Sequence, residues 1–320
     1  MLLLYLATAT LPTPPPLIST HTGFVMARQR DETKEFMQAF KLAKQGRFAE
    51  AATIYGPLAA QGNNLAQFHL GNICYLGALG QPDYSCAFEQ FSKAAHAGFD
   101  EGQFALGTLL EKGLGTPKDL AAAFHWYMLA AKQERMPEAQ TAVGLAYYNG
   151  HGVARDDAEA LSWYKKAAAR QHAAAQFNIG MAYKDGRGVR QNYKEAIYYL
   201  NAAAHQKFAR AEVELGRIYL YGLGVPIDQQ KGVGWYQRAA ERGVAKAQLG
   251  LGRVYSTGQG AAIDHVQAYK WYSLMLMGKD ISRSDSTNAT TFRNNAAAML
   301  TPDQLARAQA LVRDWKPVIE

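Results

Sequence analysis

Glycines that recur in pairs are the residues of this 320-residue chain best suited to hold a ligand through the backbone. One pair is Gly150 and Gly152, in YYNGHGVARDD, and the same spacing returns in KGLG, DGRG, YGLG and TGQG. A glycine-rich loop cradles a phosphate when it follows a strand and opens a helix whose free N–H groups point at one ligand. Each pair here lies between two predicted helices, and five identical nucleotide sites on one chain are not expected. We therefore interpret the glycines as tight turns.

The other reactive side chains form no catalytic or metal-binding pattern. The two cysteines, Cys74 and Cys86, are too few for a disulfide framework or a zinc cage. Cys74 falls at a predicted core position and Cys86 at an exposed one, so we expect no bridge between them. The histidines fall at unrelated positions, and no Ser–His–Asp or Cys–His arrangement has supporting context. We predict that the protein is not an enzyme and has no catalytic residues, no metal site and no cofactor.

The composition indicates a folded chain with a basic bias. Hydrophobic residues make up 48% of the sequence, which excludes a mainly disordered chain. Basic residues outnumber acidic ones, 34 − 27 = +7, and they are spread along the chain. This charge permits an acidic partner, but a dispersed charge indicates no more than solubility.

The first residues, 1–30, are predicted to be disordered or weakly signal-like. Their apolar stretch, Leu2–Leu6, is short, no basic residue precedes it, and it cannot span a membrane. The Pro12–Pro16 run ends any helix there. Two interpretations remain open: export to the periplasm with residues 1–25 as a signal peptide, or translation that starts at Met26. We favour a cytoplasmic protein.

The strongest signal in the sequence is an internal repeat. A glycine after an aliphatic residue recurs in steps of 36, 37, 36, 36 and 36 residues. A second glycine follows six residues later in every copy, and an Asp or Asn suited to cap a helix N-terminus follows the turn. The glycines that open the copies are Gly71, Gly107, Gly144, Gly180, Gly216 and Gly252. Such periodicity indicates modules that bury their faces against one another.

Each copy is predicted to form two helices. In the third copy, residues 139–150 place Ala139, Val143 and Tyr147 at helical spacing, and Gly150 suits the left-handed residue that ends a helix. The second helix carries a Trp–Tyr pair that we predict to be buried between modules, so that Trp163→Ala costs about 3–5 kcal/mol. The pairs are Trp126-Tyr127, Trp163-Tyr164, Trp235-Tyr236 and Trp271-Tyr272.

The pattern A-Q-x-x-L-G-x-x-Y-x-x-G-x-G-V-x-x-D-x-x-x-A-x-x-W-Y-x-x-A-A resembles the Sel-1-like repeat, a relative of the tetratricopeptide repeat. The resemblance covers residues 63–277 in six copies. It implies an all-α fold, a right-handed α-solenoid of stacked antiparallel helix pairs, and a role in protein–protein interaction. The end copies depart from the pattern: Cys74 takes the tyrosine place in the first, and Met275-Leu276 replaces Ala-Ala in the last.

Both ends of the array are predicted to carry capping helices. Residues 31–62 resemble a tetratricopeptide helix pair, and residues 278–320 are predicted to form a loop and C-terminal capping helices. Thr301 is the expected N-cap of the last helix, with Pro302 at the first helical position. A solenoid needs such caps because its last module otherwise exposes its packing face.

The resemblance also implies a partner-binding groove along the first helices. By similarity to tetratricopeptide folds, its residues lie two before, two after and five after the aliphatic residue that precedes the first glycine. These residues are Phe68, Asn72, Tyr75, Phe104, Thr108, Glu111, Thr141, Leu145, Tyr148, Phe177, Met181, Lys184, Val213, Arg217, Leu220, Leu249, Arg253 and Ser256.

We predict a scaffold or adaptor that binds a protein or peptide segment in this groove and is itself a monomer. Lys184, Arg217 and Arg253 favour an acidic segment, because charge-assisted bonds to arginine are strong. The alternative is a basic helical repeat that binds RNA, although Glu101 and Glu111 interrupt a continuous basic stripe. The salt dependence of binding separates the two.

Overall fold

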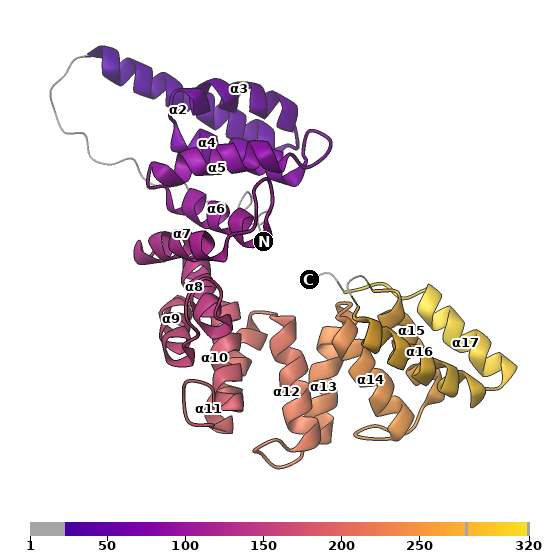
Figure 1. Ribbon diagram of the computed structural model, residues 1–320. Helices are drawn as coiled ribbons and strands as arrows, with labels where there is room; N and C mark the ends of the chain where they lie inside the picture. The colour runs from indigo at the N-terminus through magenta and orange to yellow at the C-terminus, as the bar shows by residue number, and fades with distance from the viewer. Residues whose placement is uncertain (1–22, 279–280, 319–320) are drawn as a thin grey trace. The chain divides into compact units, whose positions relative to one another are not determined.

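The computed structural model describes residues 23–278 and 281–318, and every regular element in that part of the chain is an α-helix. This confirms the predicted all-α fold of helix pairs. The chain divides into two compact units, Met1–Asp156 and Asp157–Glu320. The helices of the first unit are α2 (Gly23–Lys44), α3 (Phe48–Ala60), α4 (Asn64–Leu76), α5 (Tyr84–His96), α6 (Asp100–Lys112), α7 (Leu120–Lys132) and α8 (Pro137–Asn149) (Figure 1). Each helix packs against the next one along the chain.

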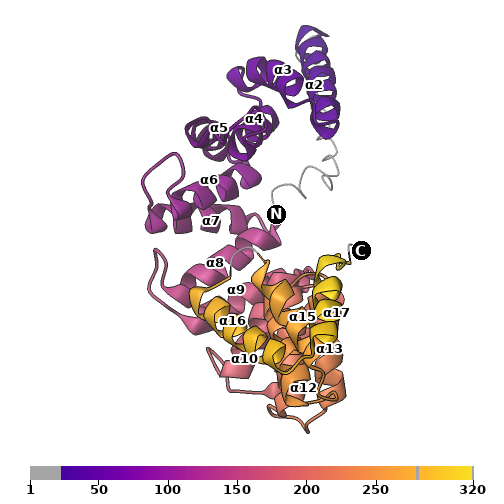
Figure 2. The same cartoon turned by 90° about the vertical axis from the view of Figure 1, so that its right-hand side faces the viewer.

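The second unit continues the same pattern and adds two helices at its end. Helices α9 to α15 each pack against the next helix along the chain. The last two helices, α16 and α17, both contact α15. Figure 2 shows α16 and α17 beside α15. The helices of this unit are α9 (Asp157–Ala169), α10 (Ala173–Asp185), α11 (Tyr193–His205), α12 (Ala209–Tyr221), α13 (Gln229–Glu241), α14 (Ala245–Thr257), α15 (His265–Leu276), α16 (Arg283–Ala298) and α17 (Pro302–Arg313).

Local sequence signals place the helix ends. The first glycine of each turn is left-handed and ends the first helix of its copy, with φ between 65° and 78° at Gly77, Gly113, Gly150, Gly186, Gly222 and Gly258. The predicted N-caps are confirmed at the described second helices where the side chain accepts a backbone N–H, namely at Asp83, Asp119, Asn192, Asp228 and Asp264. Thr301 caps α17 in a capping box with Gln304, with Pro302 at the first turn, as predicted.

From the second copy on, the last glycine of the turn lies against the second helix of the copy before it. A Cβ on Gly188 would overlap the carbonyl oxygen of Asp157, the first residue of α9, and a Cβ on Gly152 would overlap that of Leu120, the first residue of α7. Both glycines also have positive φ, at 68° and 73°. Only glycine therefore fits where the turn of one copy approaches the second helix of the preceding copy.

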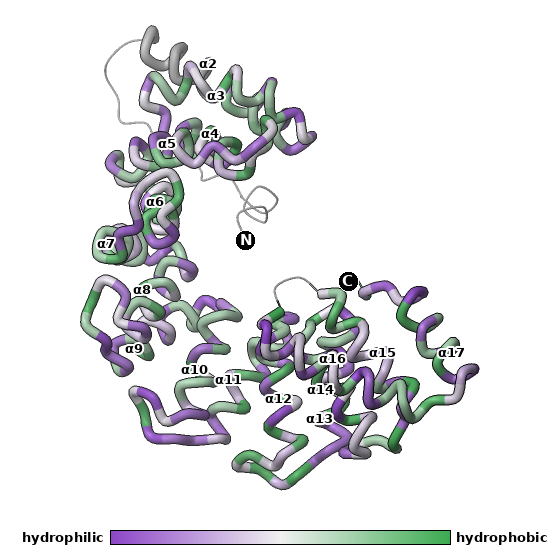
Figure 3. Tube along the Cα trace, turned by 45° about the vertical axis from the view of Figure 1, so that its right-hand side comes forward, coloured by the Kyte–Doolittle hydropathy of each residue, from purple (hydrophilic) through white to green (hydrophobic). Residues whose placement is uncertain are grey.

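Small residues and tyrosine rings fill the core of each unit. Tyr236 and Tyr272 are almost fully buried, and a Cβ on Gly216 would lie only 2.9 Å from the Tyr236 ring. Each tyrosine ring thus occupies the space that the glycine of the first helix leaves open. Hydrophobic and hydrophilic stretches alternate along the trace of these helices, as an amphipathic helix requires (Figure 3).

The tryptophans of the Trp–Tyr pairs are less buried than predicted. Trp271 is 2% exposed, whereas Trp126, Trp163 and Trp235 are only partly buried. The Trp163 ring instead carries the Lys166 ammonium 3.8 Å from its centroid. We therefore expect Trp163→Ala to cost less than about 3–5 kcal/mol, because a partly exposed ring does not leave a closed cavity when it is removed.

A buried polar contact recurs inside the array, with a glutamine in most copies and a glutamate in one. The glutamines at the start of the first helices donate to a carbonyl eight residues earlier, as Gln103 does to Ala95 and Gln248 to Ala240. In the fifth copy, Glu212 takes this place. Its carboxylate is fully buried and pairs with Arg242, 30 residues on.

Two other copies hold the uncharged version of the same pair. Gln206 donates to Gln176 over 2.8 Å, and Gln133 donates to Gln103 over 3.1 Å, again 30 residues apart. Where residue 212 is glutamate and not glutamine, residue 242 is therefore arginine and not glutamine. This arrangement keeps the buried carboxylate paired.

The two cysteines form a disulfide, and the prediction that they stay apart is wrong. Cys74 lies in the last turn of α4 and Cys86 in the first turn of α5, with their Cα atoms 5.9 Å apart. The tight turn brings the end of one helix beside the start of the next, so that a buried and a partly exposed side chain meet. The burial that the repeat pattern predicts for each cysteine did not indicate how close the two Cα atoms are.

The N-terminal helix begins earlier than the predicted capping pair. Helix α2 starts at Gly23, so its first turns lie within the segment 1–30 that was predicted to be disordered or signal-like; residues 1–22 of that segment lie outside the described part. None of the helices that the structure describes is long and apolar enough to cross a bilayer.

Candidate partner-binding surface

The backbone N–H groups of the Gly150–Gly152 turn make contacts within the protein. The N–H groups of Gly150 and His151 both donate to the carbonyl of Ala146 and thereby close the end of α8. Gly152 faces the carbonyl oxygen of Leu120, whose partial negative charge would repel an anion. Within the described residues, no group of three or more His, Cys, Asp or Glu side chains could hold a metal ion.

The structure sorts the predicted groove residues into three groups by exposure. The buried residues are Phe68, Asn72, Thr141, Phe177, Val213, Leu220 and Leu249. Tyr75, Phe104, Thr108, Glu111, Tyr148, Met181, Lys184 and Ser256 are partly buried. The exposed residues are Leu145, Arg217 and Arg253. The buried residues cannot reach a partner, and for them the predicted exposure is wrong.

Packing between copies explains why the first predicted row is buried. The ring of Phe177 lies 5.3 Å from that of Phe208, the residue that precedes the next first helix, and Phe68 lies 5.6 Å from Phe99 in the same way. This position therefore contacts the neighbouring copy. Arg210 adds to the cover, since its guanidinium lies 4.6 Å from the centroid of Phe177.

The accessible stripe of the first helices follows a different register from the predicted one. On α12 it consists of Arg210, Glu214, Arg217 and Tyr221, and only Arg217 belongs to the predicted rows. Spacing by three and four residues could have found this stripe, because residues one turn apart share a helix face.

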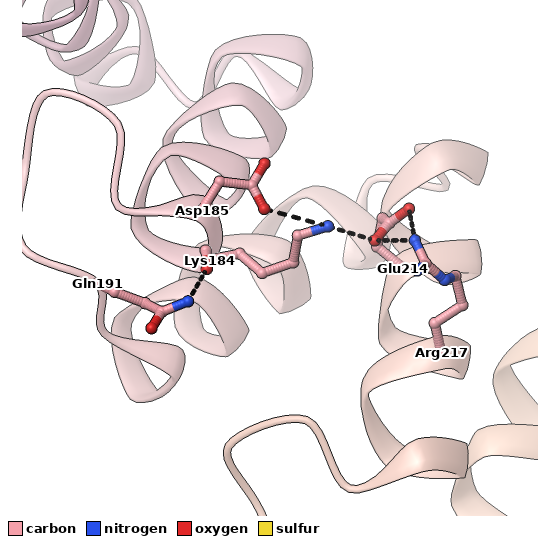
Figure 4. Close-up of polar contacts among 5 residues, drawn as sticks. All are labelled: Lys184, Asp185, Gln191, Glu214 and Arg217. Carbon is pink, nitrogen blue, oxygen red and sulfur yellow. Dashed lines mark hydrogen bonds and ion pairs between the residues drawn. The ribbon is translucent and has the colours of Figure 1, made fainter.

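An ion-pair network neutralises part of the predicted basic cluster. The Glu214 carboxylate lies between two cations: it accepts from Lys184 over 3.0 Å and from Arg217 over 3.2 Å (Figure 4). Asp185 lies a further 3.6 Å from the Lys184 ammonium. The Lys184 side chain is only 11% exposed. Lys184 therefore holds α10 to α12 and is not a free cation, whereas the residue that neutralises it, Glu214, was missed by the predicted rows.

Arg253 on α14 is exposed, and no acidic side chain pairs with it in the part of the chain that the structure describes. It occupies the place in α14 that Arg217 occupies in α12. The place of Glu214 is taken by Gly250, which leaves room for the ring of Tyr236. The sixth copy thus keeps the cation and lacks its carboxylate.

In the first unit, a polar cluster occupies the corresponding region of the second copy. Tyr127 donates to Glu111 over 3.0 Å, and its hydroxyl lies 3.4 Å from that of Thr108. Burial, together with the nearby Glu111 charge, raises the pKa of Tyr127 above its usual range. These two predicted groove residues therefore hold a tyrosine of the core, which leaves them less free to bind a partner.

Helix pairs repeated every three dozen residues, joined by glycine turns and packed through tyrosine and alanine, define a helical-repeat protein with an α-solenoid fold. The Sel1 repeat model matches residues 64–99, 100–134, 137–172, 173–208, 209–244 and 245–280. The chain belongs to the Sel1 repeat family. Proteins of this family are generally protein-interaction scaffolds and are typically non-catalytic.

A solved structure of a Sel1 repeat protein shows the same fold. A Sel1 repeat protein from Oxalobacter formigenes is 31% identical, with a TM-score of 0.70 over 75% of this chain and 98% of that one. The c5321 protective antigen of uropathogenic Escherichia coli is 22% identical, with a TM-score of 0.49 over 90% of this chain and 85% of that one.

Two curated proteins are similar to a short stretch of the chain. DAP3-binding cell death enhancer 1 from Rattus norvegicus is 49% identical over 41 residues, which are 13% of this chain and 8% of that protein. The protein of the same name from Mus musculus matches equally. The match therefore spans less than a tenth of the length of these relatives.

Proposed function

We propose that this protein is a non-enzymatic scaffold that binds a segment of a partner protein on the exposed stripe of its first helices. One observation carries the proposal. Within the second unit the packing positions repeat from copy to copy, whereas the position two residues after the aliphatic residue changes from the partly buried Met181 to the exposed Arg217 and Arg253. A surface whose chemistry varies on a constant core is suited to recognise one extended partner.

The chemistry of the stripe supports a protein partner over RNA. RNA-binding surfaces combine a continuous basic groove with side chains that read or stack on bases. Here Lys184 and Arg217 both pair with Glu214, and Met181 is apolar. Mixed apolar and charged side chains are typical of protein interfaces.

A display selection tests the proposal. Random peptides are selected on the full chain, and a photo-crosslinking amino acid is then placed singly at Met181, at Arg217 or at Tyr198. Tyr198 is the matched control, because it is 66% exposed but lies on the second helix α11. We expect the selected peptides to crosslink at the first two positions and not at the control.

Two results would contradict this function. If no peptide is enriched, or if crosslinks form only at Tyr198, the first helices do not bind peptide. If the chain instead binds RNA, with affinity that falls steeply as salt rises, the RNA-binding alternative replaces the scaffold.

A further inference from the structure

A cavity of about 450 Å³ lies at the end of the array, within the second unit. It is lined by α14, α15 and α16, together with Tyr221 at the end of α12. Helix α16 lies beyond the residues matched by the Sel1 repeat, so the wall that it contributes comes from outside the repeat.

One side of the cavity is aromatic and apolar. The rings of Tyr272 and Phe292 lie 5.6 Å apart, and Tyr272 is almost fully buried. Tyr221 and Met299 line the same cavity and are 46% and 65% exposed. Large apolar side chains that stay exposed around a hollow indicate a place where another molecule binds.

Arg253 is the one Arg or Lys among the residues that line the cavity, which also include His265 but no Asp or Glu. Its guanidinium lies 5.6 Å from the centroid of Phe292, so the cation and the apolar wall are adjacent. The hydroxyls of Ser256 and Tyr272 lie 3.0 Å apart beside it.

Comparison with the preceding copy shows that this charge is unbalanced. Arg217, one copy earlier, lies 3.2 Å from the Glu214 carboxylate, whereas Gly250 stands at the equivalent place beside Arg253. An arginine beside an apolar wall and without a carboxylate is complementary to an acidic group on a partner.

We propose that this cavity binds an acidic–apolar pair of a partner peptide: the side-chain carboxylate of an Asp or Glu on Arg253, and a large apolar side chain of an adjacent residue against Phe292, Tyr221 and Met299. The inference rests on the proposed function and names the chemistry of the segment that is bound. The cavity is large enough for one large side chain and part of its backbone. The exposed position of Arg253 lets the peptide continue in both directions, as an internal segment does.

The test compares Arg253 with an exposed arginine outside the stripe and the cavity. Arg238 is 53% exposed and lies on the second helix α13. Peptides enriched on the wild-type chain are synthesised with fluorescein and with blocked ends, and their affinities are measured by fluorescence anisotropy for wild type, Arg253→Gln and Arg238→Gln. We expect an acidic residue beside a large apolar one in the enriched sequences. Arg253→Gln should weaken binding at least tenfold, and Arg238→Gln less than twofold, because a bond to a charged partner is lost only in the first.

Further variants separate the two halves of the cavity. Met299→Ser should weaken the same peptides several-fold, and circular dichroism confirms that each variant keeps its helices. Replacing the acidic residue of the peptide with its amide should remove the difference between wild type and Arg253→Gln. A peptide that needs a free C-terminal carboxylate, and not the acidic side chain, would overturn the internal-segment proposal.

The outcomes distinguish this proposal from the scaffold function. If enriched peptides bind equally to wild type and Arg253→Gln but crosslink to Met181 or Arg217, the scaffold stands and the cavity proposal is wrong. If no peptide is enriched on the wild-type chain, both are wrong.

Discussion

The buried pair of Glu212 and Arg242 offers a sharp test of how the array is held together. The Glu212 side chain is 0% exposed and that of Arg242 is 18% exposed. Breaking a buried ion pair by removing one partner costs about 3–5 kcal/mol, because the other charge stays buried and unpaired. Arg242 keeps some contact with water, so we expect Glu212→Ala to lower the free energy of unfolding by about 3 kcal/mol, the lower end of that range.

Removing both charges together should cost far less. The double variant Glu212→Gln, Arg242→Gln reproduces the Gln176–Gln206 pair of another copy, in which the amides are 2.8 Å apart. The new amide can also donate to the carbonyl of Ala204, as Gln248 does to Ala240 over 3.3 Å. Each such hydrogen bond contributes about 1 kcal/mol, so the double variant should lie within about 1 kcal/mol of wild type.

Urea unfolding followed by circular dichroism measures these differences, and hydrogen exchange in α12 and α13 shows whether they are local. The control is Arg238→Gln, since Arg238 lies 3.9 Å from Glu212 and is 53% exposed; it should cost less than about 1 kcal/mol. The reasoning is refuted if Glu212→Ala costs no more than this control, or if the double variant is as unstable as Glu212→Ala.

Three other perturbations have expected outcomes that thermal or urea unfolding can check. Gly188→Ala should destabilise the chain by about 2–4 kcal/mol, through positive φ and overlap with the preceding copy, whereas Gly234→Ala, in an exposed helix with free space around it, should stabilise it by about 0.5–1 kcal/mol; equal effects would contradict the role of the second glycine. Reduction of the Cys74–Cys86 disulfide, which closes a loop with a sequence separation of 12, should lower stability by about 2–3 kcal/mol, and a reducing agent without effect on the melting temperature would contradict it. Burial lowers the pKa of His69 to about 4, so between pH 4 and the ordinary His pKa of about 6.5 the unfolded chain binds more protons than the folded chain. The free energy of unfolding should therefore be unaffected by this group above pH 6.5 and fall by about 3 kcal/mol towards pH 4. The variant His69→Phe should remove this pH dependence.

The repeat and its fold could be predicted from the sequence because they depend on local chemistry. Glycine at a left-handed position and Asp or Asn at an N-cap act within a few residues, and the period of the pattern places them. Thr301 at the start of α17 was predicted for the same reason.

Contacts between copies could not be predicted in the same way. The neutralisation of Lys184 depends on Glu214, 30 residues away in the next copy, and the burial of Phe177 depends on Phe208. The cavity beside Arg253 depends on α16, whose sequence lies outside the repeat. Each of these needs the relative placement of two helices, which the periodicity of one helix does not contain.

The second glycine of each turn has a consequence for how such a chain can grow. Because Gly152 and Gly188 each lie against the second helix of the copy before them, a duplicated stretch spanning α12 and α13 would meet equivalent neighbours at its two ends. Gene duplication could thus lengthen the second unit without changing the contacts between its copies. The terminal cavity would keep both its walls, since the last copy would still follow a Tyr221 equivalent and precede α16. Length and terminal specificity can therefore evolve separately.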